Sequence, residues 1–341
     1  MNRWPTGIRA SAPGIVVLLI GLSLPFWFIT SKYSLVIVMT VMIWAIAAQG
    51  WNIVGGYGGL LSFGHSVFFG IGAYTTAILT ARLGISPWIG MAAGAVLSAI
   101  IGAVLTFPAL RLKGTYFTLA SFVLALLLTD IAVIAVPVTG GDLGINLPFL
   151  SGNDFWMLQF DDRLNYYYIL VIFLAVATLV VGLVAYSKLG LFLRSSRDDP
   201  DAARTAGVDV TRVRLVGLMI SAAITSIAGS LMLQFLGAVT PGTSFSATAA
   251  FTIGMAALVG GRGTIVGPIL GAAILIPAQQ VLASVFSDGP AGISGIAYAV
   301  VIIAVVMFDS RGIVHVLQRI GRAVLRIVRR RPVSTVEGIG S

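Results

Sequence analysis

The chain has 341 residues, of which 58% are hydrophobic and only 10% are charged. A soluble domain carries roughly 25% charged residues, so this chain is expected to work within a lipid bilayer, and its lack of cysteine excludes disulfides and Cys-ligated metal centres. The net charge of +9 lies mostly in short stretches beside apolar segments, a pattern that favours membrane topology over nucleic-acid binding.

Long apolar segments recur along the first 310 residues. Crossing a hydrocarbon core of about 30 Å takes about 20 helical residues, so we expect an all-α, polytopic transmembrane bundle of about 8–10 spans over 1–310. The first segment resembles a signal peptide but shows no small-residue cleavage site, and it is interpreted as a retained span. The eighth segment is short enough to be a half-helix or a re-entrant segment. The predicted spans are 12–30, 34–54, 66–82, 88–110, 114–136, 165–186, 213–236, 248–260, 264–286 and 293–309.

The distribution of charge predicts the orientation of the bundle. Ten crossings place both termini on one side, and that side then holds 18 of the 21 Lys and Arg residues. Positive residues concentrate on the cytoplasmic side of a membrane. We therefore expect a multi-pass protein of a bacterial-type plasma (inner) membrane with both termini cytoplasmic, a basic inner loop and an acidic, aromatic outer loop at 137–164.

A glycine-rich stretch interrupts the pattern between the second and third spans. Residues 55–59 read GGYGG, and glycine destabilises a helix interior by about 1 kcal/mol relative to alanine, so a turn or an unwound stretch is predicted. Transporters use such breaks to expose backbone groups to a substrate, whereas the alternative is a plain glycine-rich turn. The candidate pathway residues in this region are Gln49, Asn52, Gly58, Gly59 and His65.

His65 has two interpretations: it shapes the broken region, or it is an ordinary hydrogen-bonded histidine. Asp130, in the fifth predicted span, is a further pathway candidate. A charged side chain at the bilayer centre costs at least about 2.5 kcal/mol, so such a residue is a functional hypothesis. Asp130 lies only about two helical turns from the outer end of its span, and the alternative is that it reaches interfacial water.

Small residues recur at four-residue spacing in two spans. Lipid provides no hydrophobic drive for helix association, so such stripes predict close helix–helix seams, either within the chain or with a second subunit. The stripes are Gly217, Ser221, Thr225 and Gly229 in one span, and Gly263, Gly267 and Gly271 in another.

The inner loop 195–214 predicts a short helix. Asp198 or Asp199 is placed to cap a helix entered through Pro200, and Gly207 is placed to end it with a positive φ. A small face on such a helix suits docking into a groove of another protein, whereas the alternative is an ordinary amphipathic connector. That face comprises Ala202, Ala203 and Ala206.

The C-terminal segment 311–341 is a basic tail. Between 311 and 330 its apolar residues fall on one helical face and its arginines on the opposite face. This pattern predicts a cytoplasmic amphipathic helix lying on anionic lipid of the inner leaflet. The alternative is a disordered basic tail.

Several blocks resemble a known family. The inner loop has an acid, two alanines, three residues and a glycine, Asp201-Ala202-Ala203-x-x-x-Gly207. It resembles the "EAA" coupling loop of ABC importer permeases, with Asp in place of Glu and without the usual I-x-L-P ending. Four more blocks resemble Liv-type permeases for branched-chain amino acids, and their spacing is closer to the LivM-like than to the LivH-like subunit. They are GGYGGLLSFGHSVFFGIGAYTTAIL (55–79), LRLKGTYFTLAS (110–121), TGGDLGI (139–145) and ALVGGRGTIVGPILGAAIL (257–275).

The resemblance implies a permease subunit of an ABC importer. It implies a second, LivH-like permease subunit, two cytosolic ATPase subunits and a periplasmic or extracellular substrate-binding protein. Asp201, Ala202, Ala203 and Gly207 would then contact an ATPase. The chain itself is not expected to hydrolyse ATP, because none of its three lysines lies in a Gly-x-x-x-x-Gly-Lys-[Ser/Thr] phosphate loop. No enzymatic activity and no cofactor are expected.

Other functions compete with this one. Urea or short amides are an alternative cargo within the same family. An ion-coupled secondary transporter or a channel acting alone is an alternative of another class, although it is expected to keep several intramembrane acids. A membrane-embedded enzyme would need a nucleophile–base pair or a metal site within the spans, and the sequence offers neither histidine a partner nearby.

Overall fold

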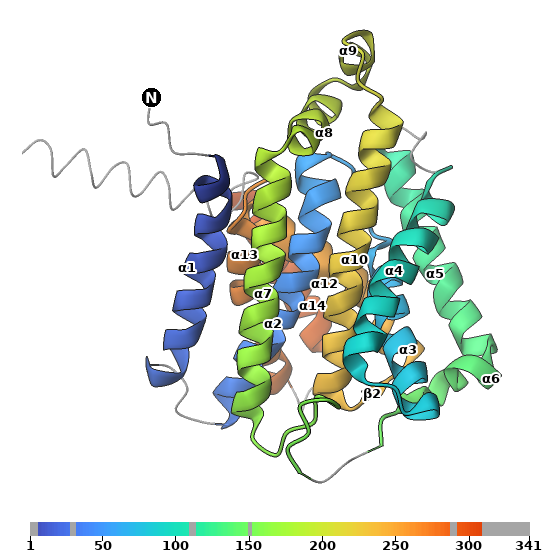
Figure 1. Cartoon of the computed structure of the whole chain (residues 1–341), viewed down its shortest axis with the longest axis vertical. Helices are drawn as coiled ribbons and strands as arrows, with labels where there is room; N and C mark the ends of the chain where they lie inside the picture. The colour runs from blue at the N-terminus through green and yellow to red at the C-terminus, as the bar shows by residue number, and fades with distance from the viewer. Residues whose placement is uncertain (1–5, 28–31, 109–113, 149–151, 287–291, 309–341) are drawn as a thin grey trace, which may run out of the picture.

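The long helices of the chain stand side by side, and the connecting segments gather at the two ends of the bundle (Figure 1). A computed structural model describes residues 6–27, 32–108, 114–148, 152–286 and 292–308. One end carries α8 (Lys188–Asp198) and α9 (Pro200–Thr205) and is called the α9 end. The opposite end carries α6 (Val136–Thr139) and β2 (Ala238–Val239) and is called the β2 end.

Eight helices of the described residues are long and apolar enough to cross a membrane. They confirm the predicted polytopic helical bundle. The second predicted span is continued by a π-helix, and the eighth combines α12 with the short α11. The spans are built from α2 (Lys32–Trp51) with η1 (Asn52–Tyr57), α3 (His65–Leu83), α4 (Pro87–Thr106), α5 (Thr115–Ile134), α7 (Arg163–Tyr186), α10 (Val210–Leu236), α11 (Pro241–Ser244) with α12 (Ala247–Gly261), and α13 (Gly267–Val285).

The two outermost predicted spans fall on shorter apolar helices. The described apolar part of α1 (Thr6–Trp27) covers Ala12–Ser23. Helix α14 (Ile293–Phe308) has 16 residues, which at 1.5 Å per residue gives about 24 Å. The basic tail 311–341, with its predicted lipid-binding face, lies outside the described residues.

The β2 end contains extended backbone that the helical prediction did not include. After α6 and the 3₁₀-helix η3 (Gly141–Leu143), strand β1 (Ile145–Asn146) pairs antiparallel with β2, and Ile145 stands opposite Val239. Gly144 and Gly237 precede the two strands with φ angles of 69° and 73°. These left-handed conformations, which glycine adopts without strain, stop the preceding helical turns and leave short extended segments side by side.

Helix α10 lies among α2, α3 and α4, and the predicted stripe of small residues forms its seams within the chain. A methyl group at Gly229 would overlap the backbone of Phe69 in α3, and the Ser221 hydroxyl donates to the Gly50 carbonyl of α2 at 2.7 Å. The second stripe also packs inside the chain, because Gly271 lies against the α12 backbone at Ala256. Close backbone approach replaces the hydrophobic drive that lipid cannot provide.

Helix α1 packs chiefly against α7. The Tyr167 hydroxyl donates to the Gly21 carbonyl at 2.6 Å, and Gly14 lies against Ala175 and Leu179. On its other side, a groove of about 750 Å³ with almost wholly apolar walls separates α1 from α2 and α13. Among the described segments, α1 is thus joined to the bundle mainly by one seam.

Candidate functional site

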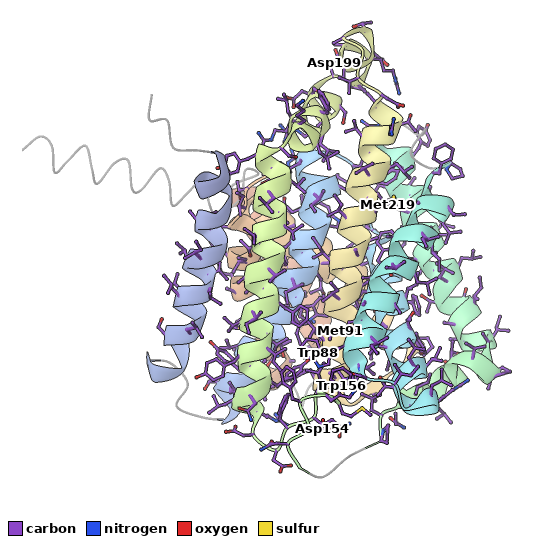
Figure 2. The ribbon with its side chains drawn as sticks, in the orientation of Figure 1. Trp88, Met91, Asp154, Trp156, Asp199 and Met219 are labelled. Carbon is purple, nitrogen blue, oxygen red and sulfur yellow. The ribbon has the colours of Figure 1, made fainter. Side chains whose placement is uncertain are left out.

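Helix α9 projects from one end of the bundle, where Asp199 lies at the tip (Figures 1 and 2). The Asp199 carboxylate accepts hydrogen bonds from the backbone N–H groups of Asp201 at 2.9 Å and Ala202 at 3.0 Å, which confirms Asp199 as the cap. Gly207 ends the turn with φ 83°, as predicted. Both ends of the helix are therefore fixed by residues next to it in the sequence.

The four predicted coupling residues do not share one environment. Ala203 is turned inward and is 5% exposed, and its carbonyl accepts from the Val208 N–H at 3.0 Å. Asp201, Ala202 and Gly207 are exposed, and Asp201 pairs with Arg204 at 2.6 Å. A side chain at Gly207 would meet open space. The outward face of α9 thus presents small residues and one acid–base pair.

Helix α8 joins α9 to the bundle, and the sequence prediction did not include it. Leu193, 1% exposed, packs against Gly217 of α10 and Gly58 beside η1. Arg194 lies over the Tyr57 ring, 5.1 Å from its centroid. The separation of apolar from charged residues around the helix axis over 188–198 indicates an amphipathic helix, and this signal could have located it.

The glycine-rich stretch continues α2 as a π-helix and then turns. Residues 52–57 form η1, and Gly59 turns the chain with φ 70°. The Asn52 side chain, fully buried, accepts from the Gly263 N–H and donates to the Thr264 carbonyl, both at 2.8 Å. These two bonds join the interrupted end of α2 to the turn between α12 and α13. Isolated π-turns inside helices are frequent at functional sites.

Gln49 joins the same turn, since its amide donates to the Ile265 carbonyl at 2.7 Å. We call the meeting of η1 with the turn 261–266, including the side chains of Gln49 and Asn52, the joint. Gln49 is fully buried, and its carbonyl oxygen has no hydrogen-bond partner in the described part of the chain.

His65 lies in a continuous chain of hydrogen bonds. Its Nε2 is 2.7 Å from the Ser221 hydroxyl, which itself donates to the Gly50 carbonyl. A hydroxyl has one hydrogen to give, so Ser221 accepts from Nε2–H, and the network assigns that tautomer. Nδ1 then accepts from the Ser62 hydroxyl at 3.0 Å. Both ring nitrogens are satisfied, and the ring ties the start of α3 to α10.

Asp130 lies apart from the joint, exposed on the outer face of α5. Of the six predicted pathway residues, the structure brings together Gln49, Asn52, Gly58 and Gly59 at or beside the joint, with His65 at the following helix start. None of the six lines the three cavities described for this chain.

A cavity lined by apolar residues and by several hydroxyl-bearing ones lies between α2, α3, α10, α11, α12 and α13. Its volume is about 520 Å³, and no charged side chain of the described residues lines it. One wall is aromatic, because Trp44 and Phe69 stack with centroids 5.3 Å apart and planes within 1° of parallel. The polar lining side chains are Thr40, Thr243, Ser244, Ser246, Thr248, Thr252, Gln279 and Gln280. We call this the hydroxyl cavity; sequence reasoning missed it.

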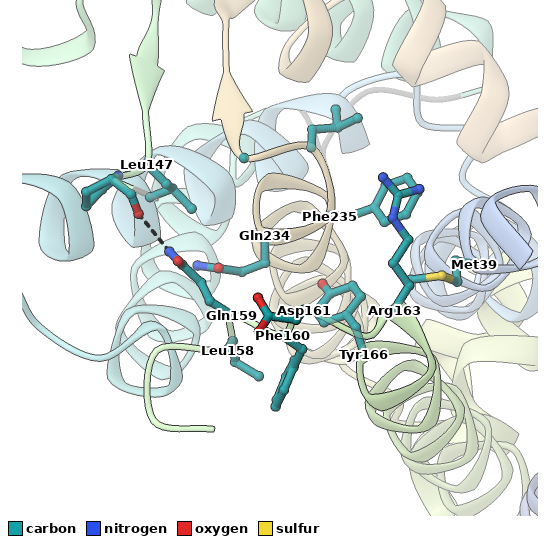
Figure 3. Close-up of a pocket in the computed structure, with 13 residues that line it drawn as sticks. Met39, Leu147, Leu158, Gln159, Phe160, Asp161, Arg163, Tyr166, Gln234 and Phe235 are labelled. Atoms are coloured by element: carbon teal, nitrogen blue, oxygen red, sulfur yellow. Dashed lines mark hydrogen bonds between the residues drawn. The ribbon is translucent and has the colours of Figure 1, made fainter. Parts of the chain in front are cut away.

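A second pocket, of about 440 Å³, lies between the start of α7 and the end of α10 (Figure 3). Gln234 points into it, and neither polar atom of its amide has a partner among the described residues. Asp161 and Arg163 also line this pocket, and Gln159 donates to the Pro148 carbonyl at 2.8 Å.

The loop 152–162 is held against the start of α4 by hydrogen bonds from side chains to its backbone carbonyls. The Trp88 indole donates to the Phe155 carbonyl at 2.9 Å, and Ser86 donates to the Trp156 carbonyl at 2.6 Å. Trp156 lies at the β2 end near Asp154, whose carboxylate accepts from the Trp156 N–H at 2.8 Å (Figure 2). Phe155 and Trp156 are more than 60% exposed, so this loop presents aromatic surface.

Comparison with known proteins connects these features to one group of proteins. Residues 33–308 match the family model described as "Branched-chain amino acid transport system / permease component". The chain is similar to the "High-affinity branched-chain amino acid transport system permease protein LivM" of Salmonella typhimurium, at 30% identity over 79% of this chain and 67% of that protein. It is similar to LivM of Escherichia coli, at 30% identity over 78% and 68%, and to LivH of Escherichia coli, at 29% identity over 68% and 79%. No solved structure matches the chain.

Proposed function

Because the chain belongs to the family of branched-chain amino acid transport system permease components, we propose that it forms part of the membrane pathway of an ABC importer for branched-chain or related amino acids. Membership makes it a transmembrane, non-catalytic subunit of a transporter that works with ATPase and binding-protein partners. The cargo, the direction of transport, the second permease subunit and the orientation in the membrane are parts of the proposal.

The observation that carries the proposal is the geometry of α9. A rigidly capped helix with a small outward face projects beyond the spanning helices (Figure 1). Asp199 fixes its start and Gly207 its end, and its outer residues are exposed. Such a helix fits a groove on an ATPase subunit, with Asp201, Ala202 and Gly207 at the contact and Ala203 supporting the turn from inside.

The charges of the described residues favour a cytoplasmic α9 end. Helices α8 and α9 and the start of α10 carry six basic residues and four acids, whereas the described part of the β2 end carries three basic residues, Lys32, Arg82 and Arg163, and four acids. Positive residues concentrate on the cytoplasmic side. The acids at the β2 end are Asp142, Asp154, Asp161 and Asp162.

The β2 end suits the binding protein. Its outer loop is anchored to α4 and exposes Phe155 and Trp156, and exposed aromatic residues are favoured at protein–protein contacts. The position of Asp130 supports a contact between α5 and a second permease subunit, because an exposed carboxylate on a spanning helix is costly against lipid. We assign α5 to that subunit contact, where Asp130 would face a pathway shared by two chains.

The hydroxyl cavity supports the cargo assignment. An amino acid with an aliphatic side chain presents an apolar part and a polar zwitterion without net charge. The Trp44–Phe69 wall suits the apolar part, and the hydroxyl and amide groups among the lining residues suit the zwitterion. The residues at the joint support the helices that surround the hydroxyl cavity. Their direct contact with substrate stays a prediction.

Two glycines give a matched test. Gly207 and Gly84 both have positive φ, and a side chain at either would meet open space, but Gly84 ends α3 at the opposite end of the bundle. Gly207→Asp and Gly84→Asp therefore add the same charge and comparable backbone strain at different places. The complex is reconstituted with its binding protein and assayed for uptake of radiolabelled leucine and urea and for co-purification of the ATPase.

We expect Gly207→Asp to weaken ATPase association by about 30-fold or more, the effect of losing a central contact, and to abolish uptake. Gly84→Asp should retain both. Leucine uptake by the wild-type complex would support the cargo assignment, whereas uptake of urea alone would replace it. Transport by this chain without any ATPase would contradict the ABC mechanism and favour a secondary transporter.

A further inference from the structure

Arg197, in the last turn of α8, contacts the interrupted end of α2. Its Nη1 donates to the Gly56 carbonyl at 3.1 Å. Gly56 lies inside η1, where the backbone bonds of α2 end and carbonyl groups lose their regular helical partners. A guanidinium from a distant helix therefore satisfies a carbonyl that the break releases.

The same guanidinium lies beside the turn between α12 and α13. A Cβ atom at Gly263 would lie 3.4 Å from Arg197 Nη1 and 3.3 Å from the Gly56 oxygen. Gly263 has φ 73° and donates to Asn52 at 2.8 Å. Three elements thus meet around the Arg197 side chain: the end of α8, η1 and the turn after α12. The joint holds the turn after α12 in this place.

Glycine at position 59 makes this approach possible. Gly59 has φ 70°, and a side chain there would overlap the aliphatic stem of Arg197. Leu193, one turn earlier on α8, packs on Gly58. Gly59 therefore lets α8 lie directly on the chain after η1, whereas a Cβ atom at Gly58 would crowd the Val54 carbonyl.

Arg197 also pairs with Asp198, the last residue of α8, which directly precedes the Asp199 cap of α9. Its Nε donates to Asp198 at 3.0 Å, and its Nη2 lies 3.0 Å from the same carboxylate oxygen. The Asp199 N–H bonds to the Ser195 carbonyl at 3.1 Å, so the α8–α9 connection is short and hydrogen-bonded. Arginine holds both partners because its donors form a rigid planar fork, which lysine lacks.

We propose that Arg197 is a positioning residue that transmits displacement of α9 to η1 and to the turn between α12 and α13. The inference rests on the proposed function, since it takes α9 to be the ATPase contact. When α9 moves with an ATPase, α8 moves with it, and the Arg197–Gly56 bond carries that movement into the end of α2. The hydrogen bonds of Asn52 in the joint then transmit this movement to α12 and α13.

The test compares Arg197→Gln with Arg212→Gln. Arg212 is exposed at the start of α10, at the same end of the bundle, so both variants remove one positive charge from one region. Arg197→Lys keeps the charge without the fork. Each variant is measured in the reconstituted complex for ATPase association and for leucine transported per ATP hydrolysed. Hydrogen exchange is measured in the purified chain over 53–60 and 262–266.

We expect Arg197→Gln to keep the ATPase bound but to lower transport per ATP by about tenfold or more, within the usual range for a lost coupling. Exchange over the two segments should rise by about tenfold, as expected for one lost charge-assisted bond. Arg197→Lys should lie between wild type and Arg197→Gln in both measurements, and Arg212→Gln should match wild type.

Unchanged transport per ATP in Arg197→Gln would overturn the inference, even if exchange rises, because Arg197 would then be merely structural. An equal loss in Arg212→Gln would overturn it too, since charge alone would explain the effect. Failure of the proposed function looks different: the wild-type complex itself would show no ATP-driven uptake.

Discussion

Replacing Asn52 by alanine tests the joint most directly. The side chain is fully buried, and it makes one bond to the Gly263 N–H and one to the Thr264 carbonyl, both at 2.8 Å. Asn52→Ala removes both bonds and leaves two backbone groups without their partner inside the bundle.

The magnitude follows from those two bonds. Interhelical hydrogen bonds in membrane proteins contribute about 0.6 kcal/mol on average and about 1.7 kcal/mol at most. Two of them give a loss of about 1 to 3 kcal/mol in the free energy of unfolding, with the upper value if the exposed groups find no new partner.

Two control variants put the loss in the free energy of unfolding of Asn52→Ala in context. Gln49→Leu removes the bond to the Ile265 carbonyl at 2.7 Å and a longer one to the Thr178 hydroxyl at 3.4 Å, but it also removes a buried carbonyl oxygen that has no partner in the described chain, so we expect a loss below about 1 kcal/mol. Ser284→Ala removes an exposed hydroxyl bonded only within its own helical turn, so the change should stay within about 0.5 kcal/mol.

The assay is unfolding in mixed micelles with increasing SDS, followed by helical circular dichroism and tryptophan fluorescence. Trp51 reports on this region, since its indole donates to the Ser62 carbonyl at 2.6 Å. A free energy of unfolding for Asn52→Ala within 0.5 kcal/mol of Ser284→Ala would refute the reasoning. So would a larger loss for Gln49→Leu than for Asn52→Ala.

Three further predictions concern the seams and the cap. Gly271→Ala should destabilise the chain by about 1 to 3 kcal/mol in the same SDS titration, because the added methyl group overlaps the α12 backbone. The control Gly295→Ala, at an open position of α14, should be neutral or stabilising by up to about 1 kcal/mol. Equal effects of the two variants would contradict the seam between α12 and α13. Asp199→Ala should remove both cap bonds and lower the stability of α9 by about 1 kcal/mol. Hydrogen exchange over 200–206 should then become faster, and unchanged exchange would argue against the cap. Tyr167→Phe should lose the bond to Gly21, about 0.6 to 1.7 kcal/mol, and speed the labelling of a cysteine placed on the inner face of α1.

Features that depend on neighbouring residues could be predicted from the sequence. The spans follow from apolar length, and α9 follows from Asp199, Pro200 and Gly207, whose capping and φ preferences act within a few residues. The stripe on α10 could be predicted as a seam, but its partners could not, because small residues do not indicate which helix approaches them.

The joint and the hydroxyl cavity depend on contacts between distant segments. The glycines of 55–59 indicated a break, yet the backbone continues as η1, where Asn52 bonds to a turn more than 200 residues away. Leu193 likewise gives α8 its place by packing on Gly217. The cavity draws its hydroxyl groups from several helices, and each one alone is an ordinary residue of a spanning segment.

The single seam of α1 has a consequence for biogenesis. Its main partner, α7, begins at Arg163, so 135 residues separate the end of α1 from the helix that holds it. At about 5 to 20 residues per second of synthesis, α1 waits in the bilayer for about 7 to 27 s before Tyr167 and its neighbours are made. During that interval the helix against which its glycines pack is absent. The family match begins at residue 33, after α1, and α1 completes its main seam only once α7 has been made.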